Sequence, residues 1–265
     1  NKIVNSGDLK LVFMGTPDLA RTVLAALADD TRFQILAVVV QPDKPTGRGL
    51  QLTPPPVKVE ALARGIPVLQ PLKARDPGFL DPLRALAPDL IAVAAYGQIL
   101  PQALLRLPKF GALNVHPSLL PKYRGASPIQ AAILNGDKTT GVTLMMMDEL
   151  LDHGPILAQA ALPIKKDDSC ETLSNELVEL SVELLEKNLP LYLAGKIKPK
   201  PQKHEFATFT KIIKRADGLV DWQKPALEIE RRLRAFSPWP GIFTVWTRQN
   251  QPLRQTAAAL RFFEL

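Results

Sequence analysis

The feature that most constrains the fold of this 265-residue chain is the alternation of short apolar runs with amphipathic helical patterns over its first two thirds. Five apolar runs, rich in β-branched or aliphatic residues, lie at residues 9–13, 34–40, 67–69, 90–95 and 112–116. Helical periodicity separates several of them, at residues 18–28, 57–64 and 81–87. Strands that alternate with helices favour an α/β fold, with a mostly parallel sheet and helices on both faces. In such folds, ligands bind beyond the carboxyl ends of the strands.

The pattern continues with a helix and two further strands, expected at residues 128–134, 141–147 and 155–164. A long helix is then predicted from about Ser169 to Ala194. Asp168 can act as its N-cap, and Glu171, three residues later, would complete a capping box. Gly195 supplies the stop at the far end. These elements complete a first domain, which we place at residues 1–195.

The composition changes beyond this domain. Residues 196–210 combine prolines with lysines and are interpreted as a basic linker. Residues 211–265 form a smaller second unit, with a helix expected at 226–235. Much of the net charge of +7 lies here, since residues 196–234 hold eleven Lys or Arg against five Asp or Glu. A basic region beside a near-neutral domain favours a polyanionic partner, most simply nucleic acid, and a solvated basic face is the alternative.

Two further properties limit the cellular setting. The chain has one cysteine, Cys170, so no disulfide can form within it and a reducing environment fits. No apolar run is long enough to span a membrane, and residues 1–10 lack the apolar core of a secretory signal. We therefore expect a cytoplasmic protein with no membrane partner.

One long segment, residues 41–56, interrupts the alternation. Its prolines and glycines predict that it forms no regular element. Structureless segments of this length inside a compact domain tend to be functional or disordered. Lys44 and Arg48 are therefore candidates for contacts with an anionic partner, and a mobile loop without a role is the alternative.

The clearest candidate for chemistry is the pair Asn114-x-His116 at the end of the fifth apolar run. The two side chains share a face, because side chains alternate along a strand. An amide and an imidazole that converge on one point suit a reaction at a carbonyl, where one holds the developing oxyanion. Asp152 is the preferred carboxylate partner, because Gly154 marks a tight loop that could turn it toward the strand ends. Asp148 is a rival, and a structural histidine beside a turn asparagine is the non-catalytic alternative.

Other chemistries are poorly supported. No G-x-G-x-x-G follows the first strand and no G-x-x-x-x-G-K-[ST] occurs, which argues against nucleotide phosphate chemistry. His116 and His153 are too few for a metal site without a cysteine cluster, so we expect no metal. A triad of Ser118, His116 and Asp152 lacks the G-x-S-x-G elbow that presents a serine nucleophile. Direct transfer of an acyl group to an amine, without a covalent intermediate, remains.

The stretch NVHPSLLPKYRG at residues 114–125, with LDHG at 151–154, resembles the catalytic signature of the 10-formyltetrahydrofolate-dependent formyltransferases. The resemblance implies that Asn114, His116 and Asp152 are catalytic. It implies that a neighbouring segment contacts the folate, namely Ser118, Leu119, Leu120 and Pro121. It also implies 10-formyltetrahydrofolate as the co-substrate and a Rossmann-like sheet of the formyltransferase type.

Further segments are similar to the methionyl-tRNA formyltransferases within this group, namely residues 13–18, 41–49, 55–58, 221–222 and 234–241. The resemblance implies formyl transfer to methionyl-initiator tRNA in translation initiation. It implies that Lys44 and Arg48 lie in a loop that wedges against the tRNA acceptor end. It also implies that residues 211–265 begin a small OB-like barrel that helps to hold tRNA. We expect the protein to be a monomer.

Two departures from this family concern tRNA binding. Leu50 and Gln51 stand where the family has a basic pair after Gly49, which weakens the expected contact of the loop. Residues 247–265 do not follow the family pattern and offer too few strands for a barrel, so we expect an incomplete C-terminal domain. Three alternatives stay open: the same chemistry on a sugar nucleotide or another small amine, hydrolysis of the folate, and a non-catalytic RNA-binding module.

Overall fold

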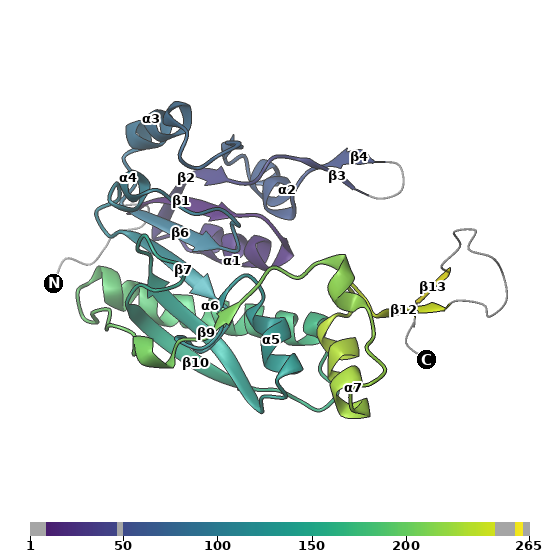
Figure 1. The fold of residues 1–265 in the computed structure, drawn as a ribbon. Coiled ribbons are helices and arrows are strands. Elements are labelled where there is room, and N and C mark those ends of the chain that lie inside the picture. The colour runs from purple at the N-terminus through teal and green to yellow at the C-terminus, as the bar shows by residue number, and fades with distance from the viewer. Residues whose placement is uncertain (1–8, 47–49, 247–257, 262–265) are drawn as a thin grey trace.

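The computed structural model describes residues 9–46, 50–246 and 258–261. Its centre is a seven-stranded sheet in the order β10-β9-β7-β6-β1-β2-β5 (Figure 1). The strands are β1 (Leu9–Gly15), β2 (Phe33–Val39), β5 (Val68–Leu69), β6 (Leu90–Ala94), β7 (Ala112–His116), β9 (Thr139–Met146) and β10 (Ile156–Pro163). The strands from β7 to β5 in this order run parallel, whereas β9 pairs antiparallel with both β7 and β10. The predicted α/β fold with a mostly parallel sheet is confirmed.

Helices cover both faces of this sheet, and the alternation of side chains along each strand divides the core in two. Leu11 and Phe13 of β1 join a core shared with α1, α2, α5 and α6. Val12 and Met14 join a second core, shared with α3 and α4. The helices are α1 (Asp18–Asp29), α2 (Pro56–Ala63), α3 (Pro77–Leu86), α4 (Gln102–Leu105), α5 (Pro128–Leu134) and α6 (Cys170–Leu193). Burial of an aliphatic or aromatic side chain of this kind contributes about 1.5–3 kcal/mol, so both faces stabilise the sheet.

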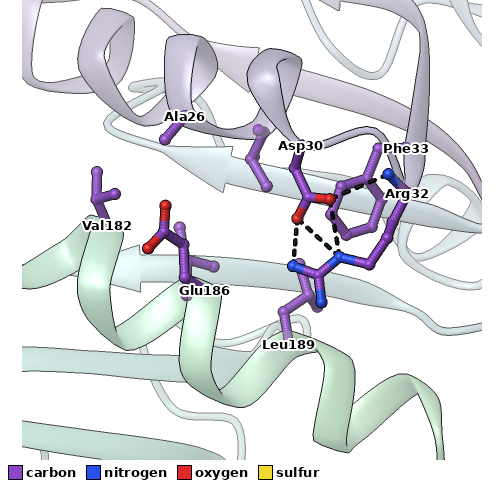
Figure 2. A pocket seen from close by; sticks show the side chains of 9 residues that line it. Ala26, Asp30, Arg32, Phe33, Val182, Glu186 and Leu189 are labelled. Atoms are coloured by element: carbon purple, nitrogen blue, oxygen red, sulfur yellow. Dashed lines mark hydrogen bonds and ion pairs between the residues drawn. The ribbon is translucent and has the colours of Figure 1, made fainter. Parts of the chain in front are cut away.

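The contact between α1 and α6 shows how closely the first face is packed. At its edge Asp30 and Arg32 form an ion pair, near Glu186 of α6 (Figure 2). The gap between the two helices has a volume of about 10 Å³, which holds at most about one water molecule. It is a small packing gap rather than a ligand site.

The start of α6 differs from the expectation. Ser169 is its N-cap: the hydroxyl accepts from the N–H of Thr172 (3.2 Å), whose own hydroxyl accepts from the N–H of Ser169 (3.0 Å). Asp168 instead accepts from the N–H of Lys165 (2.7 Å). The capping box therefore begins one residue later, because the side chains of Ser169 and Thr172, three positions apart, accept from each other's backbone N–H groups. The predicted pair of Asp168 and Glu171 is wrong.

Residues 41–56 contain regular structure, so the prediction that they form none is also wrong. Strands β3 (Lys44–Thr46) and β4 (Gln51–Thr53) pair antiparallel, with Pro45 opposite Leu52. A two-stranded ribbon leaves one edge of each strand unpaired, so it can accommodate a proline that has no N–H to donate. This β3–β4 ribbon projects from the domain beyond the carboxyl end of β2 (Figure 1).

Polar contacts hold the base of the β3–β4 ribbon. Lys58 of α2 forms an ion pair with Asp43 (2.8 Å). The side-chain amide of Gln70 donates to Asp43 (2.8 Å) and to the carbonyl of Gln41 (3.0 Å). Hydrogen bonds from Lys58 and Gln70 lower the pKa of Asp43. The ribbon is thus fixed where it leaves the sheet.

Residues 196–210, predicted as a linker, lie against the first domain. Strand β11 (Phe209–Thr210) pairs in parallel with β8 (Arg124–Gly125), and Lys200 pairs with Ile156 at the start of β10. A 3₁₀ helix, η1 (His204–Phe206), lies between these contacts. The segment therefore packs beside the residues that follow β7, while the domain boundaries themselves stay a prediction.

The second unit contains a 3₁₀ helix, η2 (Arg215–Gly218), helix α7 (Ala226–Ala235), and the paired strands β12 (Phe243–Trp246) and β13 (Ala258–Arg261). Helix α7 has the predicted bounds and packs against α5. Its end joins the core of the first domain, since Ala235 and Phe236 are buried there. Apart from β13, residues 247–265 lie outside the described residues, and the expectation of too few strands for a barrel falls largely on them.

Candidate active site

Asn114 and His116 lie at the carboxyl end of β7, between β6 and β9. Both side chains lie on the face of the sheet that α3 and α4 cover. Ala112 is two residues before Asn114 and four residues before His116, and it belongs to the core on that face. They are 8% and 4% exposed. As their spacing predicts, the strand brings an amide and an imidazole together at the edge of the sheet where ligands bind in α/β folds.

The two ring nitrogens of His116 face different oxygen atoms. Nε2 lies 3.0 Å from the carbonyl of Tyr123, and since a carbonyl can only accept, Nε2 carries the hydrogen. Nδ1 lies 3.7 Å from Oδ2 of Asp152, which is longer than an ordinary hydrogen bond. Nδ1 is therefore close to a carboxylate and able to bond a reacting group between them.

Asp152 reaches this point from the loop that follows β9. Its Oδ2 accepts from the backbone N–H of Gly125 (2.7 Å), and its side chain is 12% exposed. The rival Asp148 is bound elsewhere, to the ring of His153 (2.7 Å). A Cβ on Gly154 would lie 2.0 Å from the carbonyl of Met146. Glycine at this position therefore permits the tight loop that places Asp152, not Asp148, beside His116.

The side-chain amide of Asn114 has no hydrogen-bond partner among the described residues. Its backbone is paired on both sides, opposite Val93 of β6 and Met145 of β9. The position of the amide is therefore fixed by the sheet while its N–H groups stay available. Such a preorganised donor suits a developing oxyanion.

Two of the four side chains in the segment Ser118–Pro121 are partly exposed, and the other two are buried. Ser118 and Leu120 are 1% and 3% exposed, and the Ser118 hydroxyl donates to the carbonyl of Lys122 (2.6 Å). Leu119 and Pro121 are partly exposed. A folate could thus meet the side chains of Leu119 and Pro121 and the backbone of the segment. The hydroxyl of Ser118 is directed to Lys122 rather than His116, which agrees with the expectation of no serine nucleophile.

The loop that follows β6 opens at the same edge of the sheet, and the sequence reasoning missed it. The hydroxyl of Tyr96 is buried without a hydrogen-bond partner in the part of the chain that the structure describes. Burial raises the pKa of this hydroxyl to about 12. The carbonyl of Tyr96 accepts from the side chain of Gln41 (2.9 Å), which ties the loop to the β3–β4 ribbon. The signal that could have found it is its position directly after the apolar run at residues 90–95, at the carboxyl end of an expected strand.

A second group that sequence reasoning missed surrounds Arg124, which is 4% exposed. Its guanidinium donates to the side chains of Gln202 (2.6 Å) and His204 (2.8 Å). Burial lowers the pKa of Arg124, and the nearby Asp152 and Asp148 act against this. The ring of His204 stacks on His153 with centroids 4.0 Å apart. Residues of the predicted linker thus reach the loop that carries Asp152.

Of the two residues predicted to contact tRNA, Lys44 is among the described residues and Arg48 is not. Lys44 is exposed on β3 and donates to the side chain of Gln41 (3.0 Å). Arg48 lies outside the described residues. The predicted contacts of Lys44 and Arg48 with tRNA therefore stay predictions.

Three other features of the described ranges concern a metal ion, a membrane and a cavity. Within residues 9–46, 50–246 and 258–261, no group of three or more His, Cys, Asp or Glu could hold a metal ion. None of the helices in these ranges is long and apolar enough to cross a membrane.

A cavity of about 290 Å³ lies between α5, α7 and residues 209–217 and includes Tyr123 in its wall. It therefore lies beside the residue whose carbonyl holds His116.

Comparisons with known proteins agree with this geometry. A family model described as "Formyl transferase" matches residues 9–189, and one described as "Formyl transferase, C-terminal domain" matches residues 212–260. A methionyl-tRNA formyltransferase from Chloroflexus aurantiacus is 48% identical over 252 residues, which cover 95% of this chain and 80% of the relative.

Two solved structures share the fold. A sugar N-formyltransferase from Shewanella sp. FDAARGOS_354 has a TM-score of 0.71 at 17% identity, with 96% of each chain covered. HypX from Aquifex aeolicus in complex with tetrahydrofolic acid has a TM-score of 0.64 at 20% identity, covering 89% of this chain and 36% of that one. These two likenesses concern the fold, whereas the family models and the close relative cover sequence as well. The chain belongs to the formyl transferase family, among the methionyl-tRNA formyltransferases.

Proposed function

We propose that this chain transfers a formyl group from 10-formyltetrahydrofolate to the amino group of methionyl-initiator tRNA, in support of translation initiation. The observation that carries the proposal is the buried cluster of Asn114, His116 and Asp152 at the carboxyl end of β7. The chain that holds this catalytic cluster is 48% identical to a methionyl-tRNA formyltransferase from Chloroflexus aurantiacus. The cluster supplies the donors and the proton acceptor that acyl transfer to an amine needs.

In the proposed reaction the neutral amine of the methionyl group attacks the formyl carbon of the folate. A carbon–nitrogen bond forms, and the carbonyl oxygen becomes an oxyanion that accepts hydrogen bonds from the Asn114 amide and from Nδ1 of protonated His116, whose Nε2 donates to the Tyr123 carbonyl. Asp152 accepts the amine proton through a water molecule. The intermediate then expels N10 of the folate, which takes up a proton, so tetrahydrofolate and formylmethionyl-tRNA leave in balance.

We assign folate binding to Ser118, Leu119, Leu120 and Pro121, together with the loop after β6, which leaves the same edge of the sheet. The partly exposed Leu119 and Pro121 support an apolar contact, and the unpartnered hydroxyl of Tyr96 supports a polar group nearby. The fold neighbour HypX, which was solved with tetrahydrofolic acid, supports the assignment by analogy of fold alone.

We assign tRNA binding to Lys44 of β3, to Arg48 and to the basic residues 196–234. Lysine and arginine side chains bind phosphates and make binding depend on salt. We further propose domains at 1–195 and 211–265 joined by residues 196–210. We also propose a monomer in the cytoplasm; Asn114, His116 and Asp152 all come from one chain, so the catalytic cluster needs no residue from a second copy. Sedimentation equilibrium would test the monomer.

The proposal is tested by supplying 10-formyltetrahydrofolate with one acceptor at a time and following both folate turnover and the formylated product. We expect formylation of charged initiator methionyl-tRNA, with little turnover on an amino-sugar nucleotide or on water alone. Preferred turnover of the amino sugar, or equal turnover without any amine, would contradict it.

A further inference from the structure

The backbone of Asp152 adopts φ +45°, in the left-handed region that few non-glycine residues use. The N–H of Gly125 fixes the carboxylate of Asp152, at 2.7 Å, but it does not hold the backbone that carries it. A separate group must therefore keep this loop in place. That group comes from a residue 50 positions further along the chain.

Gln202 lies in the predicted linker and is 5% exposed. Its Nε2 donates to the carbonyls of Asp152 (2.9 Å) and Gly154 (2.8 Å). Its Oε1 accepts from Nη2 (2.6 Å) and Nε (3.2 Å) of Arg124. Because carbonyls only accept and a guanidinium only donates, one orientation of the amide satisfies all of these contacts. The side-chain amide of Gln202 thus uses its Nε2 for this loop and its Oε1 for Arg124.

These contacts close a ring around the carboxylate. Arg124 directly precedes Gly125, whose N–H binds the Asp152 side chain, while Gln202 binds both the Arg124 side chain and the Asp152 backbone. Behind this ring, the N–H of Arg124 donates to the carbonyl of Thr208 (2.8 Å). The segment that contains Gln202 therefore holds the backbone of Asp152 and also Arg124, the residue before the glycine that binds the carboxylate.

We propose that Gln202 is a positioning residue for formyl transfer, which keeps the Asp152 carboxylate beside His116 by holding the carbonyls of Asp152 and Gly154. The inference rests on the proposed role of Asp152. No hydrogen bond within the described residues joins Gln202 to Asn114 or His116, so it acts through the loop. The segment 196–210 is then part of the active site as well as a connection between domains.

The informative substitution is Gln202→Glu, which keeps the size of the side chain and its bonds from Arg124. It also directs an acceptor at two carbonyl oxygens. Because misplacing a reacting group by about 1 Å costs on the order of 10²-fold in rate, we expect kcat to fall by about 10- to 100-fold. The KM values should stay within about twofold, and the thermal unfolding midpoint should stay close to that of the wild type. Gln202→Asn, whose side chain is too short to span both partners, replaces it if the glutamate variant does not fold.

The matched control is Asn188→Asp, the same exchange of an amide for an acid. Asn188 lies on α6 and donates within its own helix, to the carbonyl of Leu184 (2.8 Å). We expect its kcat to match the wild type. A similar fall in both variants, or an unchanged kcat in Gln202→Glu, would overturn the inference.

A double-substitution cycle separates positioning from a general structural role. In an enzyme that already carries Asp152→Asn, adding Gln202→Glu should lower kcat by less than about twofold, since the carboxylate to be positioned is gone. An equal fall in both backgrounds would overturn the positioning role and leave the proposed function standing. Wild-type activity in Asp152→Asn alone would contradict the proposed role of Asp152, and the inference with it, while the formyl transfer itself would stand.

Discussion

The catalytic cluster and the β3–β4 ribbon belong to the same domain but are built in opposite ways. Asn114 and His116 are less than a tenth exposed, and the cluster is enclosed by segments far apart in the chain. In the ribbon, Leu50 and Leu52 are 72% and 71% exposed, and its ion pair lies at the base, at Asp43. One region is fixed from all sides, and the other only where it begins.

This difference separates two tasks of a transferase with a macromolecular acceptor. Chemistry at a formyl carbon needs donors and a base held in one geometry. Binding of a polyanion needs exposed cations that can reach phosphates. Substitutions in the cluster should therefore lower kcat, and substitutions in the ribbon should raise the KM for tRNA.

The largest effect is expected in the cluster. Asn114→Ala removes one oxyanion donor and should lower kcat by about 10²–10³-fold. The KM for tRNA should be unchanged, because the amide lies in the buried site. Steady-state formylation of methionyl-tRNA measures both constants. A raised KM with an unchanged kcat would show that the two regions do not divide the work in this way.

Replacing residues 44–53 by a short glycine turn should have the next largest effect. Without the ribbon, kcat/KM for methionyl-tRNA should fall by about 10- to 100-fold, because phosphate contacts are lost. Folate binding, measured by fluorescence titration, should not change. A matching loss of folate affinity would mean that the ribbon also shapes the buried site, through Gln41 and Tyr96.

A single charge in the ribbon should matter less. Lys44→Ala should raise the KM for tRNA by about two- to fivefold and reduce the slope of log KM against log salt by about one. Lys187→Ala is the matched control, since Lys187 is also exposed but lies on α6. Equal effects of the two substitutions would attribute the change to net charge instead of the ribbon.

The smallest effect concerns the base of the ribbon. Hydrogen bonds from Lys58 and Gln70 lower the pKa of Asp43 below its usual 3.8. The ionised carboxylate therefore stabilises the base above pH 3.8, and this contribution is lost as the pH falls through the lowered value. In Lys58→Met the pKa should return toward 3.8, as a carboxyl ¹³C titration would show. A wild-type titration at or above 3.8 would contradict the ion pair.

Local patterns in the sequence are sufficient for much of the fold and part of the site. The apolar run predicts a strand at residues 112–116, and β7 has these bounds. The alternation of side chains along this strand predicts that Asn114 and His116 share a face. Gly154 correctly marks the tight loop, because any larger residue would meet the carbonyl of Met146. The close placement of Asp152 and His116 follows from these local features together.

Two kinds of feature could not be predicted in this way: contacts between residues far apart in the chain, and choices between two residues that suit the same role almost equally. Gln202 meets Asp152 only in the folded chain, and nothing in its local sequence marks it. Asp168 and Ser169 are both good N-caps, and the reciprocal bond with Thr172 decides between them. Pro45 excludes a central strand but not a two-stranded ribbon, so a rule for sheets gives the wrong result there.

The role of the catalytic cluster is decided by single-turnover formyl transfer to methionyl-tRNA with His116→Ala and Asp152→Asn, beside the wild type. Removal of a positioned acid or base should slow the transfer in each variant by about 10²–10⁴-fold. The affinity for folate should stay within about threefold, since neither group is assigned to its binding. Transfer at the wild-type rate in both variants would contradict the assignment of the chemistry to this cluster.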